Sequence, residues 1–217
     1  MASPTSNQET QQKIQLFNRW ALFYDWLLPS VFYQAIHRRL LSYVQLPDNP
    51  WVLDLGCGTG QLLERLAKNF PHLYGIGLDA SPEMLRQARN ARRYSPRLIY
   101  IEGDATDLPT ADNQFDAVFN TISFLHYPQP RQVLSEVYRT LKPQGRYYLV
   151  DWVWEGTESQ VEIAAGAGKI RFYSLSKRAE LGTQMGFQFI NHHWLLASVA
   201  LTIFEKPPES PRDGSYS

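Results

Sequence analysis

The sequence lacks the features that would mark several classes of protein. One cysteine, Cys57, among 217 residues excludes an internal disulfide framework and favours a reducing compartment such as the cytoplasm. The 21 lysines and arginines balance the 21 aspartates and glutamates, so no net charge attracts nucleic acid or an acidic membrane surface. No stretch reaches the roughly 20 apolar residues that span a bilayer. The first twelve residues also lack the basic and apolar regions of a secretory signal. We therefore expect a cytoplasmic protein with no membrane insertion.

The length and composition predict a single domain with polar ends. A domain usually takes roughly 100–200 residues, so this chain has room for one. We expect a disordered head at 1–12, one domain over 13–206 and a disordered tail at 207–217. Within the domain, residues 13–46 are expected to form one or two helices separated near Pro29, and 51–206 to form the core.

Strand-like and helical segments alternate through most of the core. Segments of helical periodicity separate short apolar runs, which we expect to be strands. The expected strands are 51–56, 73–79, 98–104, 115–121 and 145–152. This alternation predicts right-handed βαβ units and a parallel sheet. The last two strand-like runs, 187–196 and 198–206, are too close for a crossover helix and should pair antiparallel. The expected fold is α/β: a doubly wound, Rossmann-like, mostly parallel seven-stranded sheet with a C-terminal antiparallel strand, helices on both faces and an N-terminal helical lid.

Three glycines follow the first strand and lead directly into a helix. They form the glycine loop, Gly56 to Gly60, in the pattern Asp54-x-Gly56-x-Gly58-x-Gly60. Such a loop lies at the carboxyl end of the first strand, where ligands of open α/β sheets bind. Its spacing is neither the G-x-G-x-x-G of dinucleotide sites nor a P-loop, because no Lys-Ser/Thr pair follows. A nicotinamide dehydrogenase is therefore disfavoured.

The run "VLDLGCGTG" resembles the first motif of the class I S-adenosylmethionine-dependent methyltransferases, and the chain is similar to the small-molecule type found in ubiquinone and menaquinone biosynthesis. The resemblance covers about residues 14 to 206. It implies S-adenosylmethionine as the cofactor, Asp79 on the ribose hydroxyls, and Asp104 with the backbone of Ala105 at the adenine edge. Gln144 departs from the family pattern, since it replaces the first glycine of the usual Lys-Pro-Gly-Gly turn.

The cofactor-binding residues that this resemblance implies lie in the first strand, the glycine loop and the segments after the second, third and fourth strands: Asp54, Gly56, Cys57, Gly58, Gly60, Asp79, Ala80, Met84, Asp104, Ala105, Asn120 and Thr121.

Methyl transfer from a sulfonium is an in-line displacement, which requires alignment and exclusion of water more than any particular side chain. His126 is a candidate base after the fourth strand, or else a capping or packing histidine. Tyr24 and Asp25 resemble a Tyr-Asp pair of related enzymes and are candidates for a lid over the cofactor, or else lie on a helix surface. Asp151, with Trp152 and Trp154, is a candidate for the acceptor pocket.

Other ligands and partners have less support. His192 and His193 are neighbours on a strand and face opposite sides, so we expect no metal site. Arg86, Arg89 and Arg93 share a helical face, which is more often solvated than a polyanion site, and no nucleic-acid partner is expected. The prediction is a methyltransferase acting on a small, largely apolar or aromatic acceptor. A non-catalytic sensor of S-adenosylmethionine, or a protein that supports a partner, is the alternative.

Overall fold

The computed structural model describes residues 28–91, 94–165 and 168–209. The chain divides after Tyr43 into two compact units, which are described separately. In the first unit, α2 covers Leu28–Leu41 and has Pro29 in its first turn, where the missing N–H costs no helical hydrogen bond. Pro29 therefore stands at the beginning of a helix. The helix expected before it lies outside the described residues.

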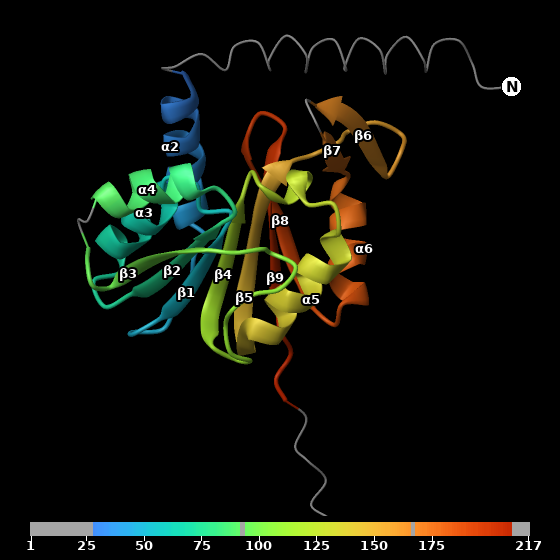
Figure 1. Cartoon of the computed structure of the whole chain (residues 1–217). Helices are drawn as coiled ribbons and strands as arrows, with labels where there is room; N and C mark the ends of the chain where they lie inside the picture. The colour runs from blue at the N-terminus through green and yellow to red at the C-terminus, as the bar shows by residue number, and fades with distance from the viewer. Residues whose placement is uncertain (1–27, 92–93, 166–167, 210–217) are drawn as a thin grey trace, which may run out of the picture. The chain divides into compact units, whose positions relative to one another are not determined.

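The second unit contains a seven-stranded sheet with the order β3-β2-β1-β4-β5-β9-β8 (Figure 1). Its strands are β1 (Trp51–Leu55), β2 (Tyr74–Asp79), β3 (Leu98–Glu102), β4 (Phe115–Thr121), β5 (Leu141–Trp152), β8 (Gln188–Leu196) and β9 (Val199–Glu205). The pairs from β3 to β5 are parallel, and β9 is antiparallel to both β5 and β8. The predicted α/β class, the mostly parallel sheet and the antiparallel C-terminal strand are confirmed. The antiparallel strand lies inside the sheet, however, with β8 at the edge.

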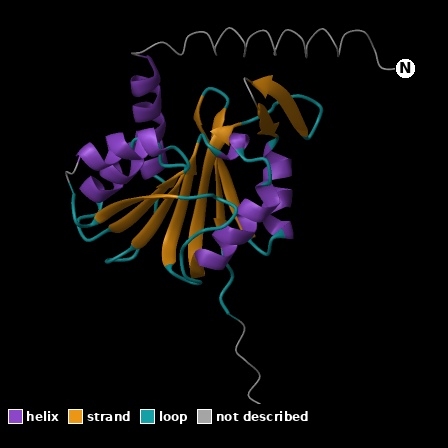
Figure 2. Ribbon diagram, in the orientation of Figure 1, coloured by secondary structure: helices purple, strands orange, loops and turns teal. Residues whose placement is uncertain are grey.

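Helices connect the strands on both faces of the sheet (Figure 2). They are α3 (Gln61–Asn69), α4 (Pro82–Ala91), the 3₁₀ turn η1 (Phe124–His126), α5 (Pro130–Thr140) and α6 (Leu175–Gln184). The chain runs outward from β1 to β3 in one direction and from β4 to β5 in the other. Right-handed crossovers then place α3 and α4 on the face opposite to α5. The strand order reverses between β1 and β4, which creates the switch point where ligands of such sheets bind.

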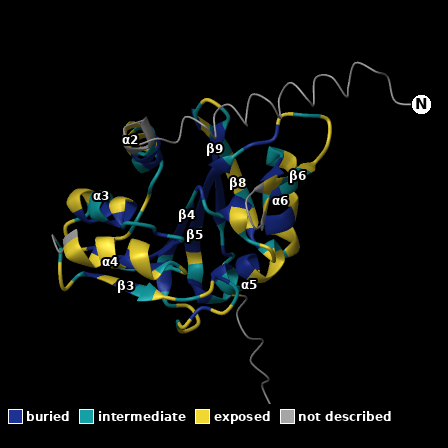
Figure 3. Cartoon of the chain, turned by 45° about the horizontal axis from the view of Figure 1, so that its top comes forward, coloured by how far each residue is buried: buried dark blue, intermediate teal, exposed yellow. Residues whose placement is uncertain are grey.

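The core follows the central strands, which appear dark blue in Figure 3. All of β9 except its last residue is buried, as are four consecutive residues of β4. The helices contribute apolar stripes such as Leu62, Leu63 and Leu66 of α3. Burial on both faces explains why these strands read as continuous apolar runs rather than as alternating patterns.

A separate hairpin, β6 (Gln160–Ala165) and β7 (Gly168–Tyr173), follows β5 and has no counterpart in the sequence prediction. The helix α6 was not predicted either. Gln144 in the irregular first part of β5 has a φ of 64°, so it takes the left-handed conformation that favours glycine. The Gln144 side chain is exposed, so the departure from the family pattern lies at the surface.

Candidate functional site

The glycine loop has a left-handed backbone at all three glycines, with φ of 73° at Gly56, 53° at Gly58 and 77° at Gly60. The amides of Gly56 and Cys57 both donate to the carbonyl oxygen of Leu78, at 2.8 and 3.0 Å. These bonds fix the loop to the carboxyl end of β2. Any residue with a side chain would adopt this conformation at a cost of about 1–2 kcal/mol per position.

The three glycines face different neighbours. A Cβ at Gly56 would lie 2.6 Å from the Cβ and Oγ of Ser123, and one at Gly60 would lie 2.5 Å from the hydroxyl of Tyr100. A Cβ at Gly58 would meet nothing within 4 Å. Packing within the protein therefore requires Gly56 and Gly60, whereas Gly58 borders open space that a ligand can enter.

Asp79 ends β2 beside this open space. Its Oδ2 accepts the amide N–H of Gly58 and its Oδ1 accepts that of Ser81, each at 2.8 Å. A carboxylate offers about four acceptor positions, so each oxygen keeps capacity for an external donor. Two adjacent hydroxyl groups, as on a ribose, match such an oriented pair of oxygens.

Ala80 and Met84 extend the surface next to Asp79. The helix α4 begins at Pro82, and the Oγ of Ser81 accepts the amide N–H of Met84 at 3.4 Å, so Ser81 caps the helix. Ala80 is exposed, and 42 % of Met84 remains exposed. The Met84 side chain is thus available to pack against a flat, apolar ligand group.

Asp54 lies within β1 and is only 2 % exposed. Burial, and then the negative charge of Asp79, raise the pKa of the Asp54 carboxyl to about 8. The group is therefore mostly protonated at neutral pH. A cation bound beside it would favour the ionised form.

The segment after β3 is tied to the same place. The amide of Gly103 donates to the main-chain oxygen of Asp79 at 3.2 Å. The Oδ1 of Asp104 accepts the amide N–H of Thr106 at 2.8 Å, which holds the pKa of the Asp104 carboxyl below its usual range. Asp104 is exposed and Ala105 is buried, so the carboxylate is oriented by its own turn at the surface.

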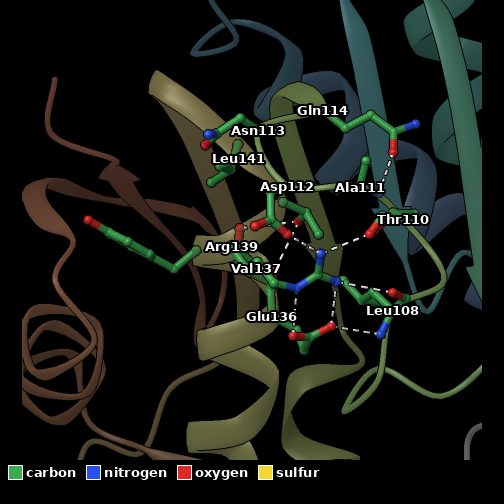
Figure 4. A network of polar contacts seen from close by, with 12 residues as sticks. Leu108, Thr110, Ala111, Asp112, Asn113, Gln114, Glu136, Val137, Arg139 and Leu141 are labelled. Carbon is green, nitrogen blue, oxygen red and sulfur yellow. Dashed lines mark hydrogen bonds and ion pairs between the residues drawn. The ribbon is translucent and has the colours of Figure 1, made fainter. Parts of the chain in front are cut away.

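Arg139 of α5 fixes the rest of this segment (Figure 4). Its guanidinium donates to the carbonyl oxygens of Leu108 and Thr110 at 3.1 and 2.8 Å, and to the carboxylates of Asp112 and Glu136 at 2.7 Å each. Glu136 also accepts the amide N–H of Leu108 at 2.8 Å. The long connection between β3 and β4 is thereby anchored to a helix.

A buried polar cluster lies at the end of β4. The Nδ2 of Asn120 is 2.6 Å from the carbonyl oxygen of Leu55, 2.6 Å from the Oγ of Ser123 and 3.2 Å from the hydroxyl of Tyr127. The Oδ1 of Asn120 and the Oγ1 of Thr121 have no partner in the described part of the chain. The cluster joins the ends of β1 and β4, and it leaves two buried oxygens for which a ligand or water would supply donors.

His126 ends η1, just beyond β4. Its amide donates to the carbonyl oxygen of Ser123 at 3.0 Å, and its side chain is exposed. Partial burial of the ring lowers the pKa of His126 below its ordinary value. The imidazole is therefore in the neutral form that can accept a proton at neutral pH.

Asp151 holds this turn in place from β5. Its Oδ2 accepts the amide N–H of Leu125 at 2.9 Å and its Oδ1 accepts that of Trp152 at 2.8 Å. Burial raises the pKa of Asp151 to about 6, against the opposing charge of Arg178. Arg178 is itself buried and donates to the carbonyl oxygens of Trp152 and Ala200. Both oxygens of Asp151 thus accept backbone amides, and Asp151 orients η1.

The remaining candidates differ in what the structure describes of them. Tyr24 and Asp25 are outside the described residues. Cys57 is buried, and burial raises the pKa of its thiol, so it is not an activated nucleophile. The Nδ1 of His192 lies 3.0 Å from the Oγ1 of Thr202, and the described residues contain no group of three or more His, Cys, Asp or Glu that could hold a metal ion. No helix among the described residues is long and apolar enough to cross a membrane.

Comparison with known proteins identifies the family. A methyltransferase-domain model matches residues 52–145, which contain the glycine loop, Asp79, Asp104 and Asn120. An uncharacterized methyltransferase of Synechocystis is 34% identical over 149 residues, which cover 63% of this chain and 67% of that protein. The chain belongs to the class I S-adenosylmethionine-dependent methyltransferases. A demethylmenaquinone methyltransferase of Thermotoga maritima is 36% identical over 141 residues, covering 64% of this chain and 60% of that protein.

Solved methyltransferases share the fold. A methyltransferase from Haloferax volcanii, solved in complex with the Trm112 methyltransferase activator, has a TM-score of 0.69 at 22% identity, and the match covers 80% of this chain and 89% of that one. The chain spans only about half (46%) of the length of the fungal sterol 24-C-methyltransferases that it also matches. The similarity to those larger enzymes is therefore confined to part of their length.

The residues present fit the cofactor of this methyltransferase family. Gly58 borders open space at the amino end of α3, Asp79 offers two oriented oxygens, and the Asp54 carboxyl can balance a bound cation. The open space at Gly58 corresponds to the amino-acid portion of S-adenosylmethionine. The two oxygens of Asp79 correspond to its ribose hydroxyls, and the titratable acid Asp54 corresponds to its ammonium group.

Sequence reasoning missed Tyr127, which follows His126 directly. Its hydroxyl reaches the Asn120 cluster and would lie 3.1 Å from a Cβ at Gly56. Burial raises the pKa of Tyr127, so the hydroxyl stays protonated. The sequence offered only the proximity of two polar aromatic residues after a strand, and nothing in that pattern indicates which of them turns inward.

Proposed function

We propose that this chain transfers a methyl group from S-adenosylmethionine to a small, largely apolar or aromatic acceptor. The observation that carries the proposal is the juxtaposition of Gly58 and Asp79: open space at a left-handed glycine, beside a carboxylate whose two oxygens are already oriented by the amides of Gly58 and Ser81. These bonds fix the carboxylate before any ligand arrives, which lowers the entropic cost of binding.

Each part of the site has a role in this proposal. Asp79 accepts the ribose hydroxyls, and Met84 packs against the adenine, whose edge meets Asp104 and the backbone of Ala105. Gly58 allows the amino-acid portion to approach the main chain, with Asp54 compensating its ammonium group. When bound, S-adenosylmethionine supplies an electrophilic methyl group on a sulfonium.

The chain's own contribution to the chemistry is alignment and proton transfer. The neutral imidazole of His126, on a turn oriented by Asp151, accepts a proton from an acceptor that carries one. The Asn120 and Thr121 oxygens lie at the end of β4, at the switch point. Tyr24 and Asp25 are proposed to belong to a lid that excludes water from the transfer site.

The acceptor class rests on the relatives and on the fourth-strand motif. The Thermotoga relative is named a demethylmenaquinone methyltransferase. The sequence at the end of β4, "NTISF", also differs from the Asn/Asp-Pro-Pro-aromatic run of enzymes that methylate nucleobase amino groups. An aromatic quinol or phenol is therefore the first acceptor to test.

The test compares S-adenosylhomocysteine binding by calorimetry in the wild type, Asp79→Ala and Asp116→Ala. Asp116 is a matched control, because it also accepts a backbone amide, that of Trp51, but lies where β4 begins. Asp79→Ala should weaken binding by about 2–4 kcal/mol, since it removes charge-assisted hydrogen bonds. Asp116→Ala should change it little. Equal affinities in all three proteins, with the fold intact by circular dichroism, would refute the cofactor site.

Turnover then tests transfer itself. The wild type is incubated with S-adenosylmethionine, 1,4-naphthoquinol and a panel of phenols, and products are identified by mass spectrometry. A methylated product that Asp79→Ala fails to form supports the proposal. Cofactor binding without product from any acceptor in the panel would favour the non-catalytic sensor.

A further inference from the structure

A cavity of about 580 Å³ lies away from the glycine loop. It is bounded by the beginning of α5, the hairpin β6–β7 and α6, and Figure 1 shows the hairpin next to the beginning of α6. Its lining contains no residue of β1, β2 or β3, which carry the proposed cofactor site. Its volume falls in the range of about 300–1,000 Å³ that is usual for small-molecule sites.

The charged lining is predominantly basic. Arg131, Arg171 and Lys177 line the cavity with a single acid, Glu162. Arg171 and Lys169 both form ion pairs with Glu162, so its charge is already compensated. In the described part of the chain, one further acid pairs with this group: Glu180 forms an ion pair with Lys177 at 2.8 Å.

Three cationic side chains and one carboxylate line the cavity, and Lys169 and Glu180 beside it add one charge of each sign, which leaves an excess of two positive charges. Arg131 forms no hydrogen bond or ion pair within the described residues and is exposed. A cavity that collects cations beyond the number of its acids attracts an anion, because the remaining charge is not neutralised within the protein.

Neutral donors complete the wall. Gln129 and Gln160 line the cavity and contribute side-chain amides. The helix α5 begins here with Pro130 in its first turn and without a side-chain cap, so the positive end of the helix dipole adds to the charge of Arg131. Tyr173 supplies an aromatic surface, and its ring packs against that of Phe124 with the two ring centroids 5.6 Å apart.

We propose that this cavity binds a small organic anion, with its carboxylate or phosphate group between Arg131 and Lys177 and its apolar part against Tyr173 and Leu181. The site is distinct from the proposed cofactor site, but one residue of its lining bonds to the segment that leads to the Asn120 cluster. Arg171 donates to the carbonyl oxygens of Tyr127 and Pro128, at 3.0 and 2.8 Å. The wall of the cavity thus holds the segment whose Tyr127 hydroxyl reaches the Asn120 cluster.

The experiment titrates the full chain with phenyl phosphate, benzoate and phenol, each followed by calorimetry and by backbone-amide NMR shifts. Saturating S-adenosylhomocysteine is present in one series and omitted in another, so that binding at the glycine loop is recognised and the result does not depend on the proposed function. Phenyl phosphate and benzoate distinguish a phosphate from a carboxylate ligand, and phenol is the neutral control.

We expect saturable binding of at least one anion but not of phenol, with shifts at the amides of Arg131 and Gln132 rather than at Gly58 and Ser81. The double variant Arg131→Gln/Lys177→Gln should weaken binding by about tenfold or more, as the loss of two charge-assisted contacts implies. Arg86→Gln is the matched control, since Arg86 is an exposed arginine on α4, paired with Glu83.

Three results would overturn the proposal: no saturation by either anion, equal binding of phenol, or shifts confined to the glycine loop. If the double variant were unfolded, the shift pattern of the wild type would still decide, because it requires no substitution.

Discussion

The ends of β1, β2 and β3 differ from the ends of β4 and β5 in what fixes them. In the first group, hydrogen bonds from main-chain amides fix the strand ends. The amides of Gly56 and Cys57 donate to the carbonyl of Leu78. Those of Gly58 and Ser81 donate to the carboxylate of Asp79. Such an arrangement needs glycines and a short acid at fixed spacing. Other positions in these segments can carry many different residues.

The second group is fixed by buried side chains and by an inserted hairpin. Asp151 orients η1, Arg178 holds the carbonyl of Trp152 behind it, and β7 packs on η1 through Tyr173 and Phe124. The difference indicates a division of labour. On the function proposed above, main-chain geometry meets the cofactor, whereas the side of the site left for the acceptor is built from buried side chains and an inserted hairpin.

The sharpest test of this comparison is Gly56, where the two groups meet. Gly56→Ala would place a Cβ 2.6 Å from Ser123 at a φ of 73°. We expect a loss of about 3 kcal/mol in the free energy of unfolding, from backbone strain together with overpacking. Urea unfolding measures it.

Gly58→Ala is the matched control, because its Cβ would meet nothing within 4 Å. It should cost only about 1 kcal/mol of stability, from its left-handed backbone, while weakening S-adenosylhomocysteine binding more than its stability loss suggests. Equal destabilisation by the two variants would show that Ser123 yields and that the strand ends are not rigidly joined.

Asp151→Asn should have the next largest effect. The variant replaces one accepting oxygen by an NH₂ group that faces a backbone amide, so we expect a loss of about 2 kcal/mol at pH 8 and faster hydrogen exchange at Leu125. Because the folded-state pKa of about 6 lies above the ordinary value of 3.8, the wild type's free energy of unfolding should fall as pH rises from about 4 through 6. Asp151→Asn should lack that part of the pH dependence.

Asp116→Asn serves as the control, since it leaves η1 untouched. If hydrogen exchange at Leu125 rose as much in Asp116→Asn as in Asp151→Asn, the effect would reflect general loosening rather than the loss of a specific acceptor.

The same comparison explains what could be predicted from the sequence. The glycine spacing and the apolar runs encode local geometry, so the strands from β1 to β5 were predicted. The final pair of strands was predicted from the short connection between them. The positions of these two strands in the sheet were not predicted, because the pairing of β9 with β5 depends on contacts between residues distant in sequence.

The structure around the ends of β4 and β5 was harder to predict from the sequence, for a physical reason. The hairpin β6–β7 alternates charged and apolar residues over only a few positions, and its segment includes glycines and alanines with weak propensity. Asp151 is a candidate for the acceptor pocket from its place at the end of a strand, but the sequence cannot show that its oxygens accept the amides of Leu125 and Trp152. Tyr127 was missed because its inward orientation depends on Asn120 and Ser123.

The smallest effect that we predict concerns Asp54, where the cofactor side departs from main-chain recognition. With a pKa of about 8, the free carboxyl is mostly protonated at pH 6–7.5. A ligand ammonium beside it would favour ionisation, so binding of S-adenosylhomocysteine should release about one proton and tighten by about tenfold, or 1.4 kcal/mol, per pH unit in this interval. Calorimetry in buffers of different ionisation enthalpy measures the released proton. Asp54→Asn should bind without proton release and without the pH slope, while Asp116→Asn should keep both. If the affinity of Asp54→Asn still rose with pH, the released proton would come from another group, and Asp54 would not be the acid beside the ligand ammonium.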